Sequence, residues 1–190
     1  MNRREDESWW LHPLDIVRAL LRGEGPDYDR IARIRQVPPG TGLAVCVGCG
    51  IGFEPFILQS MGYKTVALDA NRNTVHVAQH LWPGPVYLWK DVMEWSPEGR
   101  PQVVLCSQAI EHFDDMDAAL AHMATWHAGA YYIELPIGMD KNPFHKHHIL
   151  TVAAGAELLG RHFGSVKELR ASDSEATWLC TCPILEADDE

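Results

Sequence analysis

Short apolar runs alternate with segments of helical periodicity over most of this 190-residue chain, and this alternation restricts its fold more than any other feature. The runs are continuously apolar, which suits strands that are buried on both faces of a sheet. The first five runs are 43–47, 65–69, 86–89, 103–107 and 130–135. The pattern predicts an α/β fold: a doubly wound, mostly parallel sheet with helices on both faces.

Two further strand candidates, 165–170 and 176–182, end the series, and only the polar turn 172–175 separates them. Because no helix fits between them, they predict a C-terminal antiparallel hairpin that completes a seven-stranded sheet. The helical patterns cover 53–61, 71–80, 115–126 and 152–162, and two shorter ones precede the sheet at 13–22 and 27–36.

Composition narrows the class of protein. The N-terminal stretch lacks the apolar core of a signal peptide, and no apolar run reaches the roughly 18 residues of a membrane span. We therefore predict a soluble, cytoplasmic protein that does not bind membranes.

Five cysteines, an odd number, lie in expected strands or in the turn after one, which favours reduced thiols. A formal net charge of −10 disfavours nucleic acid as a partner.

The first expected strand ends in a glycine-rich turn, VCVGCGIG at 45–52, which opens directly into a helix. Glycines at such a turn permit unusual φ angles and let a ligand approach the backbone closely. Phe53 stands where the dinucleotide fingerprint would have its last glycine, which weakens a pyrophosphate-binding interpretation. A plain strand-to-helix turn remains open for the glycines taken alone.

The second expected strand ends in Asp69, about 20 residues after the first glycine of the turn. At this offset an acidic side chain meets the hydroxyls of a bound ribose. The glycine turn and Asp69 together predict a cofactor that contains a nucleoside.

Four motifs, in this order and spacing, resemble those of class I S-adenosylmethionine-dependent methyltransferases. The motifs are GCGIG at 48–52, ALDAN at 67–71, KDVMEW at 90–95 and VVLCSQAIEHF at 103–113. The resemblance covers roughly residues 40–135. It implies a seven-stranded Rossmann-like fold, S-adenosylmethionine as cofactor and methyl transfer as the reaction.

The resemblance also implies which residues bind the cofactor. Glycines of the turn line its methionine and ribose, Asp69 accepts from both ribose hydroxyls, and Asp91 accepts from the adenine amine. An ordinary turn role for Asp91 is the alternative. The full cofactor set is Gly48, Cys49, Gly50, Gly52, Asp69, Ala70, Asp91, Val92 and Ser107.

Cys46 departs from the family pattern, which commonly has an acidic residue two positions before the first glycine. A thiol does not replace a carboxylate as a hydrogen-bond acceptor. Cys46 at this position has three interpretations. The chain binds the cofactor more weakly, another acid such as Glu54 compensates, or the chain is a non-catalytic binding module that keeps the fold as a scaffold.

The methyl acceptor is expected beyond the carboxyl ends of the strands, where Glu111 and His112 follow the fourth strand and the loop FHKHHIL follows the fifth. We predict that His112 is the catalytic base and that Glu111, His145 and His148 bind a small-molecule acceptor through its oxygen or nitrogen. This assignment includes no metal.

Two alternatives remain for these four residues. They partly resemble the metal site of the terminal ribose 2′-O-methyltransferases that act on small RNA, although Gln108 stands where that pattern has a glutamate. They also fit a helix cap and a solvent-exposed histidine loop without a catalytic role.

We divide the chain into an N-terminal helical region, 1–40, that forms part of a lid over the methyl acceptor, a Rossmann-like methyltransferase domain, 41–185, and an acidic tail, 186–190. Trp9 and Trp10 are candidates for an aromatic face of that lid. The absence of a long insertion after the fourth or fifth strand favours a small methyl acceptor or one that a partner protein presents. The oligomeric state is left open.

Overall fold

A computed structural model describes residues 34–138 and 145–182, and within these residues a single seven-stranded sheet has the strand order β3-β2-β1-β4-β5-β7-β6. The strands are β1 (Leu43–Val47), β2 (Lys64–Asp69), β3 (Val86–Trp89), β4 (Val103–Ser107), β5 (Ala130–Pro136), β6 (Ser165–Ala171) and β7 (Glu175–Thr181). Strands β1 to β5 run parallel, whereas β7 runs antiparallel to both β5 and β6. The predicted fold class and the C-terminal hairpin are confirmed.

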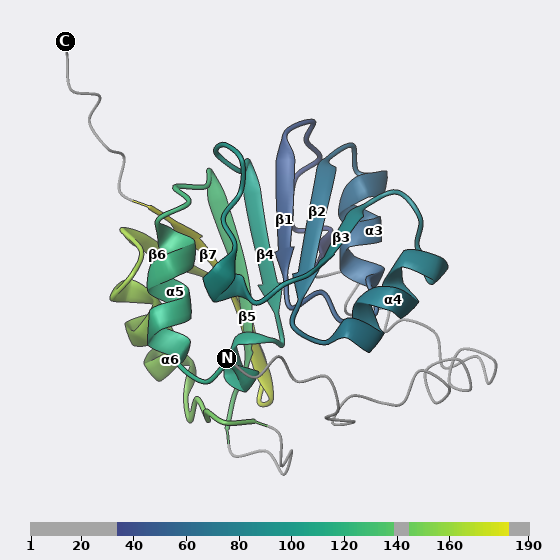
Figure 1. Cartoon of the computed structure of the whole chain (residues 1–190). Helices are drawn as coiled ribbons and strands as arrows, with labels where there is room; N and C mark the ends of the chain where they lie inside the picture. The colour runs from purple at the N-terminus through teal and green to yellow at the C-terminus, as the bar shows by residue number, and fades with distance from the viewer. Residues whose placement is uncertain (1–33, 139–144, 183–190) are drawn as a thin grey trace.

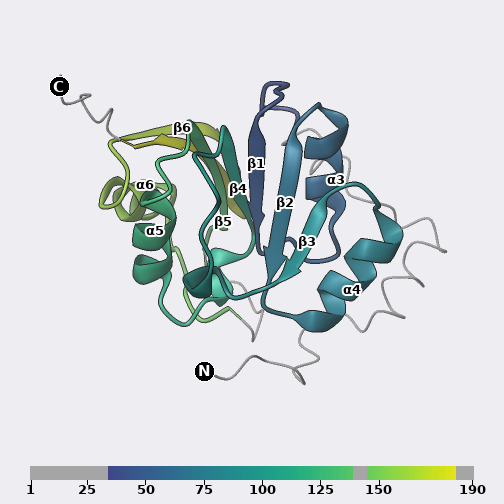
Figure 2. The same cartoon turned by 45° about the horizontal axis from the view of Figure 1, so that its top comes forward.

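Helices cover both faces of the sheet (Figures 1 and 2). They are α3 (Phe53–Ser60), α4 (Arg72–Leu81), α5 (Met116–Ala124) and α6 (Val152–Gly160), with short 3-10 turns η1 (Val92–Glu94) and η2 (Ile110–His112). Side chains of α3 and α4 join one buried apolar cluster, and side chains of α5 and α6 join the other. The sheet therefore separates two cores, as expected for strands that are apolar on both faces.

The local sequence explains where the helices start. Asn71 caps α4 by accepting from the backbone N–H groups of Asn73 and Thr74, and Asp115 caps α5 by accepting from Ala118. Side-chain oxygens at this position satisfy N–H groups that the first helical turn leaves without partners. The predicted helices 71–80 and 115–126 each begin one residue later than the pattern indicated, because these capping residues lie outside the helix.

Successive residues of the central strand β1 belong to opposite core clusters. Ala44 and Cys46 of β1 belong to the cluster with α3 and α4, whereas Val45 and Val47 belong to the cluster with α5 and α6. Because β1 pairs in parallel with both β2 and β4, the carboxyl ends of these strands meet at one edge of the sheet, where parallel α/β sheets bind their ligands.

Some predictions fall on residues that the structure does not describe: the helix at 13–22, most of the helix at 27–36, the aromatic residues Trp9 and Trp10, and the acidic tail. In the described residues, no helix is both long and apolar enough to cross a bilayer. All five cysteines lie in the described ranges and are free thiols, as predicted.

Candidate functional site

The glycine turn between β1 and α3 has a left-handed backbone at three positions. Gly48, Gly50 and Gly52 have φ angles of 66°, 50° and 84°. The N–H groups of Gly48 and Cys49 both donate to the carbonyl oxygen of Leu68, over 2.9 and 3.0 Å. These bonds fasten the turn to the end of the neighbouring strand β2.

Asp69, the last residue of β2, connects this turn to the start of α4. Its Oδ2 accepts from the N–H of Gly50 over 2.8 Å, and its Oδ1 accepts from the N–H of Asn71 over 2.8 Å. The side chain is 7% exposed. Burial raises the pKa of Asp69, while the bonds from Asn71 and Gly50 act in the opposite direction. A buried acceptor therefore stands at the glycine turn, where the sequence placed it.

The three glycines differ in the space around them. A Cβ atom at Gly48 would lie 2.3 Å from Cβ of Ala109, and one at Gly52 would lie 2.6 Å from Cβ of Ala78. A Cβ atom at Gly50 would have no atom of the described residues within 4 Å. Packing thus requires glycine at the first and third positions, whereas the middle glycine faces space that no described residue occupies.

Four other residues of the predicted cofactor set follow the same strand ends. Cys49 is buried, which raises the pKa of its thiol well above the ordinary value, and its backbone N–H and carbonyl bond to Leu68 and Gly52. Ala70 is exposed beside Asp69. Asp91 caps η1 by accepting from the N–H of Met93 over 2.9 Å, which is the turn role noted as its alternative, and Val92 is buried.

The predicted residues of the methyl-acceptor side gather around Glu111, which is fully buried in η2. Nε2 of His112 and Nε2 of His145 each lie 3.8 Å from Oε1 of Glu111. The rings of the two histidines meet edge to face, with centroids 4.7 Å apart. The described segment after β5 therefore returns to the end of β4 and completes a Glu-His-His cluster.

Backbone hydrogen bonds hold this cluster together. The N–H groups of Lys146 and His147 both donate to the carbonyl oxygen of Glu111, over 2.9 and 3.2 Å. Nε2 of His147 donates to the carbonyl oxygen of Phe113 over 3.0 Å. Because the loop makes two hydrogen bonds to η2 and one to the residue after it, His145 is held next to Glu111.

His148, the fourth predicted residue, lies at the margin of the cluster. It is exposed, and its ring centroid lies 6.5 Å from that of His145. Among the described residues, one ligand atom each from Glu111, His112 and His145 lie within 4.8 Å of one another, a spacing that could hold a metal ion. A carboxylate with two imidazoles suits a divalent transition metal or a polar methyl acceptor.

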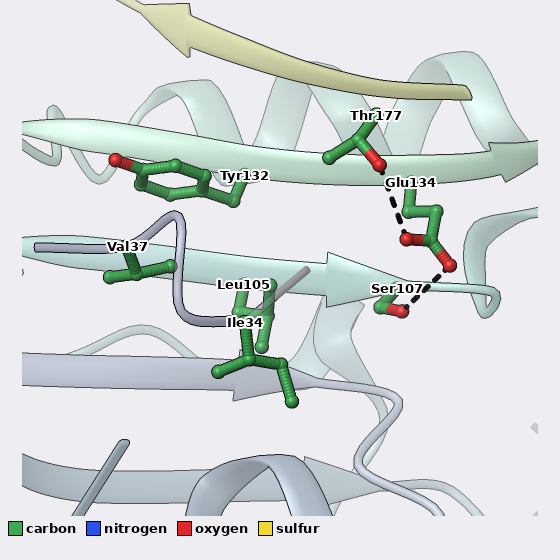
Figure 3. Close-up of a pocket in the computed structure, with 7 residues that line it drawn as sticks. All are labelled: Ile34, Val37, Leu105, Ser107, Tyr132, Glu134 and Thr177. Atoms are coloured by element: carbon green, nitrogen blue, oxygen red, sulfur yellow. Dashed lines mark hydrogen bonds between the residues drawn. The ribbon is translucent and has the colours of Figure 1, made fainter. Parts of the chain in front are cut away.

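A second polar group lies on the face of the sheet that α3 and α4 cover. Glu134 of β5 is 3% exposed and accepts from Ser107 and Thr177 hydroxyls, each over 3.2 to 3.3 Å, and from the amide of Gln108 over 3.2 Å. Figure 3 shows Glu134, Ser107 and Thr177 at a pocket that Ile34, Val37, Leu105 and Tyr132 also line. The hydroxyl of Ser107, a predicted cofactor residue, is thus directed to Glu134.

A family model described as a methyltransferase domain matches residues 29–148, which is more than half of the chain. The chain belongs to this methyltransferase-domain family. Among curated protein sequences no match is found.

Solved structures resemble this methyltransferase-domain chain at low sequence identity. A plantazolicin methyltransferase, BpumL, in complex with S-adenosylhomocysteine is 13% identical, with a TM-score of 0.71 and 92% and 93% of the two chains covered. A TehB-like methyltransferase from Corynebacterium glutamicum is 13% identical, with a TM-score of 0.67 and coverage of 89% and 95%. The N-methyltransferase NodS from Bradyrhizobium japonicum is 13% identical, with a TM-score of 0.63 and coverage of 82% and 85%. These likenesses confirm the class I methyltransferase fold.

The sequence interpretation of this methyltransferase domain did not include Glu134 or Thr177. A signal for Glu134 was present, because a carboxylate interrupts the apolar strand AYYIELP at a position buried inside the sheet. Thr177 lies in β7 and is 43 residues away along the chain, so no local pattern connects it to Glu134.

Proposed function

We propose that this chain transfers the methyl group of S-adenosylmethionine to an oxygen or nitrogen atom of a small-molecule acceptor. The observation that carries the proposal is the 2.8 Å hydrogen bond between Gly50 and Asp69, which joins an open glycine turn to a buried carboxylate. Glycine backbone and an acid from the next strand complement the sugar and polar chain of a nucleoside cofactor. Membership of the methyltransferase-domain family supports methyl transfer as the reaction.

The strand order β3-β2-β1-β4 supports one direction for the cofactor. In this proposal the adenine lies at the end of β3, with Ala70, Asp91 and Val92, and the ribose lies at Asp69 in β2. Methionine then extends along the glycine turn with Cys49 towards Ser107 in β4. Complexes of BpumL and NodS with S-adenosylhomocysteine, and of DhpI with S-adenosylmethionine, support this ligand class.

In the proposed reaction, the acceptor atom attacks the methyl carbon, the bond from sulfur to that carbon breaks, and S-adenosylhomocysteine leaves. His112 takes the proton that the acceptor atom loses. Glu111, whose carboxylate lies 3.8 Å from His112 and His145, favours a positive charge on the imidazole that takes the proton. His145 and the exposed His148 contact the acceptor and align it for in-line displacement.

Titration calorimetry tests this proposal at the level of the cofactor, and transfer of a labelled methyl group tests it at the level of the reaction. We expect saturable binding of S-adenosylmethionine and S-adenosylhomocysteine, and labelled product with at least one member of a panel of small alcohols, phenols and amines. A chain that binds neither cofactor form would be a scaffold rather than an enzyme.

A metal-assisted reaction is the second candidate, because Glu111, His112 and His145 bring three ligand atoms within 4.8 Å. Here a divalent cation would bind the acceptor oxygen, and His112 would be a ligand rather than the base. The formal net charge of −10 opposes an RNA acceptor. Loss of turnover with EDTA, restored by Mn²⁺ or Co²⁺, would favour this candidate. Turnover that chelation leaves unchanged would exclude it.

A further inference from the structure

Two histidines form a pair on the exposed face of α4. His76 and His80 are four residues apart in this helix, and both side chains are exposed. The centroids of their rings lie 4.5 Å apart, with an interplanar angle of 58°. Side chains at this spacing project from the same face of a helix, so the two imidazoles can bind one ion together. Neither residue belongs to the proposed cofactor or acceptor contacts.

A hydrogen bond to the backbone prepares His80 to act as a ligand. Its Nδ1 donates to the carbonyl oxygen of His76 over 2.8 Å. Because a carbonyl oxygen only accepts, Nδ1 carries the proton of the neutral ring, and Nε2 has the lone pair that a metal ion needs. Histidine ligands in proteins commonly donate their other ring N–H to a carbonyl oxygen or a carboxylate, which fixes the tautomer and the orientation of the ring.

The position of the pair in the helix favours a cation. Helix α4 ends at Leu81, so His80 lies in its last turn. The carbonyl groups at this end of a helix carry a partial negative charge, which attracts a cation. Arg72, one turn before His76, would oppose it, but the guanidinium carbon of Arg72 lies 5.2 Å from the centroid of the Trp89 ring. This cation–π contact directs the arginine charge to the end of β3.

The histidine pair is separate from the Glu-His-His cluster. Helix α4 packs against β2 and β3 at one end of the sheet, whereas Glu111 follows β4, on the other side of β1 (Figure 1). Within residues 34–138 and 145–182, the only group of three metal-binding side chains is that cluster. The pair on α4 therefore provides two ligands, and water or a group from another molecule completes the coordination of the ion.

We propose that His76 and His80 form a surface site that chelates a divalent transition-metal ion through one ring nitrogen of each residue. Imidazole suits Cu²⁺, Ni²⁺ and Zn²⁺, and among these Cu²⁺ binds most tightly to a given set of nitrogen ligands. Mg²⁺ prefers oxygen ligands and is not bound. The folded helix holds the two histidines together, whereas the unfolded chain does not, so the bound ion stabilises the fold.

Titration of Cu²⁺ into the chain without an affinity tag tests this proposal. The parent protein is His145→Ala, which removes one ligand from the Glu-His-His cluster, so that binding there does not obscure the signal. In this parent, His76→Ala and His80→Ala should each weaken Cu²⁺ at least about 100-fold, because one imidazole no longer adds to the other.

His127→Asn is the control, because it removes an exposed histidine outside α4 at a left-handed position that asparagine tolerates. It should leave the affinity for Cu²⁺ unchanged. Equal losses of affinity in all three variants would assign Cu²⁺ binding to exposed histidines in general and overturn the proposal. Unchanged affinity in both α4 variants would also overturn it.

A double variant tests the spacing of the pair. His76→Ala/Gln79→His keeps two exposed histidines on α4 but puts them at adjacent positions, which do not face each other in a helix. It should bind Cu²⁺ as weakly as His76→Ala. Saturating Ni²⁺ should raise the urea midpoint of the parent protein but not that of the double variant, and Mg²⁺ should raise neither. A double variant that binds Cu²⁺ as tightly as the parent would contradict chelation by the pair.

Discussion

The two halves of the site differ in how they are assembled. On the cofactor side, strand ends that follow each other in the chain meet directly, and Gly50 and Asp69 are 19 residues apart. On the methyl-acceptor side, η2 bonds to a loop beyond β5, about 35 residues away along the chain. Neighbouring strand ends therefore form the donor half, whereas segments that are distant along the chain form the acceptor half. Substitutions in such an acceptor half can change which substrate binds without altering the fold.

The largest expected effect is on the acceptor half. His112→Ala should lower kcat about 100- to 10,000-fold, the usual contribution of general base catalysis. Affinity for S-adenosylhomocysteine should stay within about 2-fold, because the proposed cofactor contacts do not include His112. Steady-state kinetics together with titration calorimetry measure both quantities.

His76→Ala, an exposed change on α4, serves as the control for this experiment and should leave kcat unchanged. If His112→Ala weakened the cofactor as strongly as it slowed turnover, the division of the site into two independent halves would be wrong.

The second prediction separates packing from binding within the donor half. Gly50→Ala places a methyl group in space that no described atom occupies, so it should cost only about 1 kcal/mol of stability from its left-handed backbone. The methyl group should nevertheless weaken S-adenosylhomocysteine at least about 10-fold, because it enters the ligand space. Calorimetry and urea denaturation give the two numbers.

Gly52→Ala should show the opposite balance. Its Cβ atom would meet Ala78 at 2.6 Å and the Tyr87 ring at 2.7 Å, which should cost about 2 to 4 kcal/mol of unfolding free energy. The comparison between Gly50→Ala and Gly52→Ala decides the point. If both variants lost stability and ligand affinity in the same proportion, the middle glycine would not face a ligand site.

A smaller effect is expected at Glu134, the buried carboxylate that bonds to the predicted cofactor residue Ser107. Glu134→Gln replaces one accepting oxygen with an N–H₂ group that faces the donors Ser107, Gln108 and Thr177. The free energy of unfolding should fall by about 1 to 3 kcal/mol, the cost of mismatched buried polar groups. Urea denaturation measures it, with Glu157→Gln as an exposed control that should change it by less than about 0.5 kcal/mol. A Glu134 variant as stable as the wild type would mean that this network does not support the fold.

The smallest effect concerns pH and Asp69. Because burial raises the pKa of this carboxyl in the folded protein, folding favours its protonated form. Its contribution to stability is therefore present below the ordinary pKa of an aspartate and is lost as the pH rises through the raised value. Urea denaturation at several pH values should show this slope in the wild type and not in Asp69→Asn. A slope of opposite sign would mean that hydrogen bonds from Gly50 and Asn71 outweigh burial.

The sequence predicted the fold, and it predicted that the glycine turn and Asp69 lie together, for a physical reason. Strands that are buried on both faces are continuously apolar, so β1, β3 and β4 were located to the residue. Gly50 and Asp69 were paired because consecutive parallel strands end at the same edge of the sheet. These features depend on local sequence and on one rule of topology.

The acceptor half could be predicted only in part, because a loop has no periodicity to indicate which side chains turn inward. His145 lies against Glu111 as expected, whereas His148 is exposed and His147 bonds to the backbone of Phe113. The sequence does not distinguish these three histidines. Their positions depend on backbone bonds between the loop and η2, which join segments about 35 residues apart.

Binding of S-adenosylhomocysteine to wild-type protein and to Asp69→Ala, measured by titration calorimetry, tests the central claim most directly. The wild type should bind one molecule per chain, and Asp69→Ala should bind it at least about 100-fold more weakly, because charged hydrogen bonds to two ribose hydroxyls are lost. Equal affinity in the two proteins, or no binding by the wild type, would show that the glycine turn and Asp69 do not form a nucleoside site.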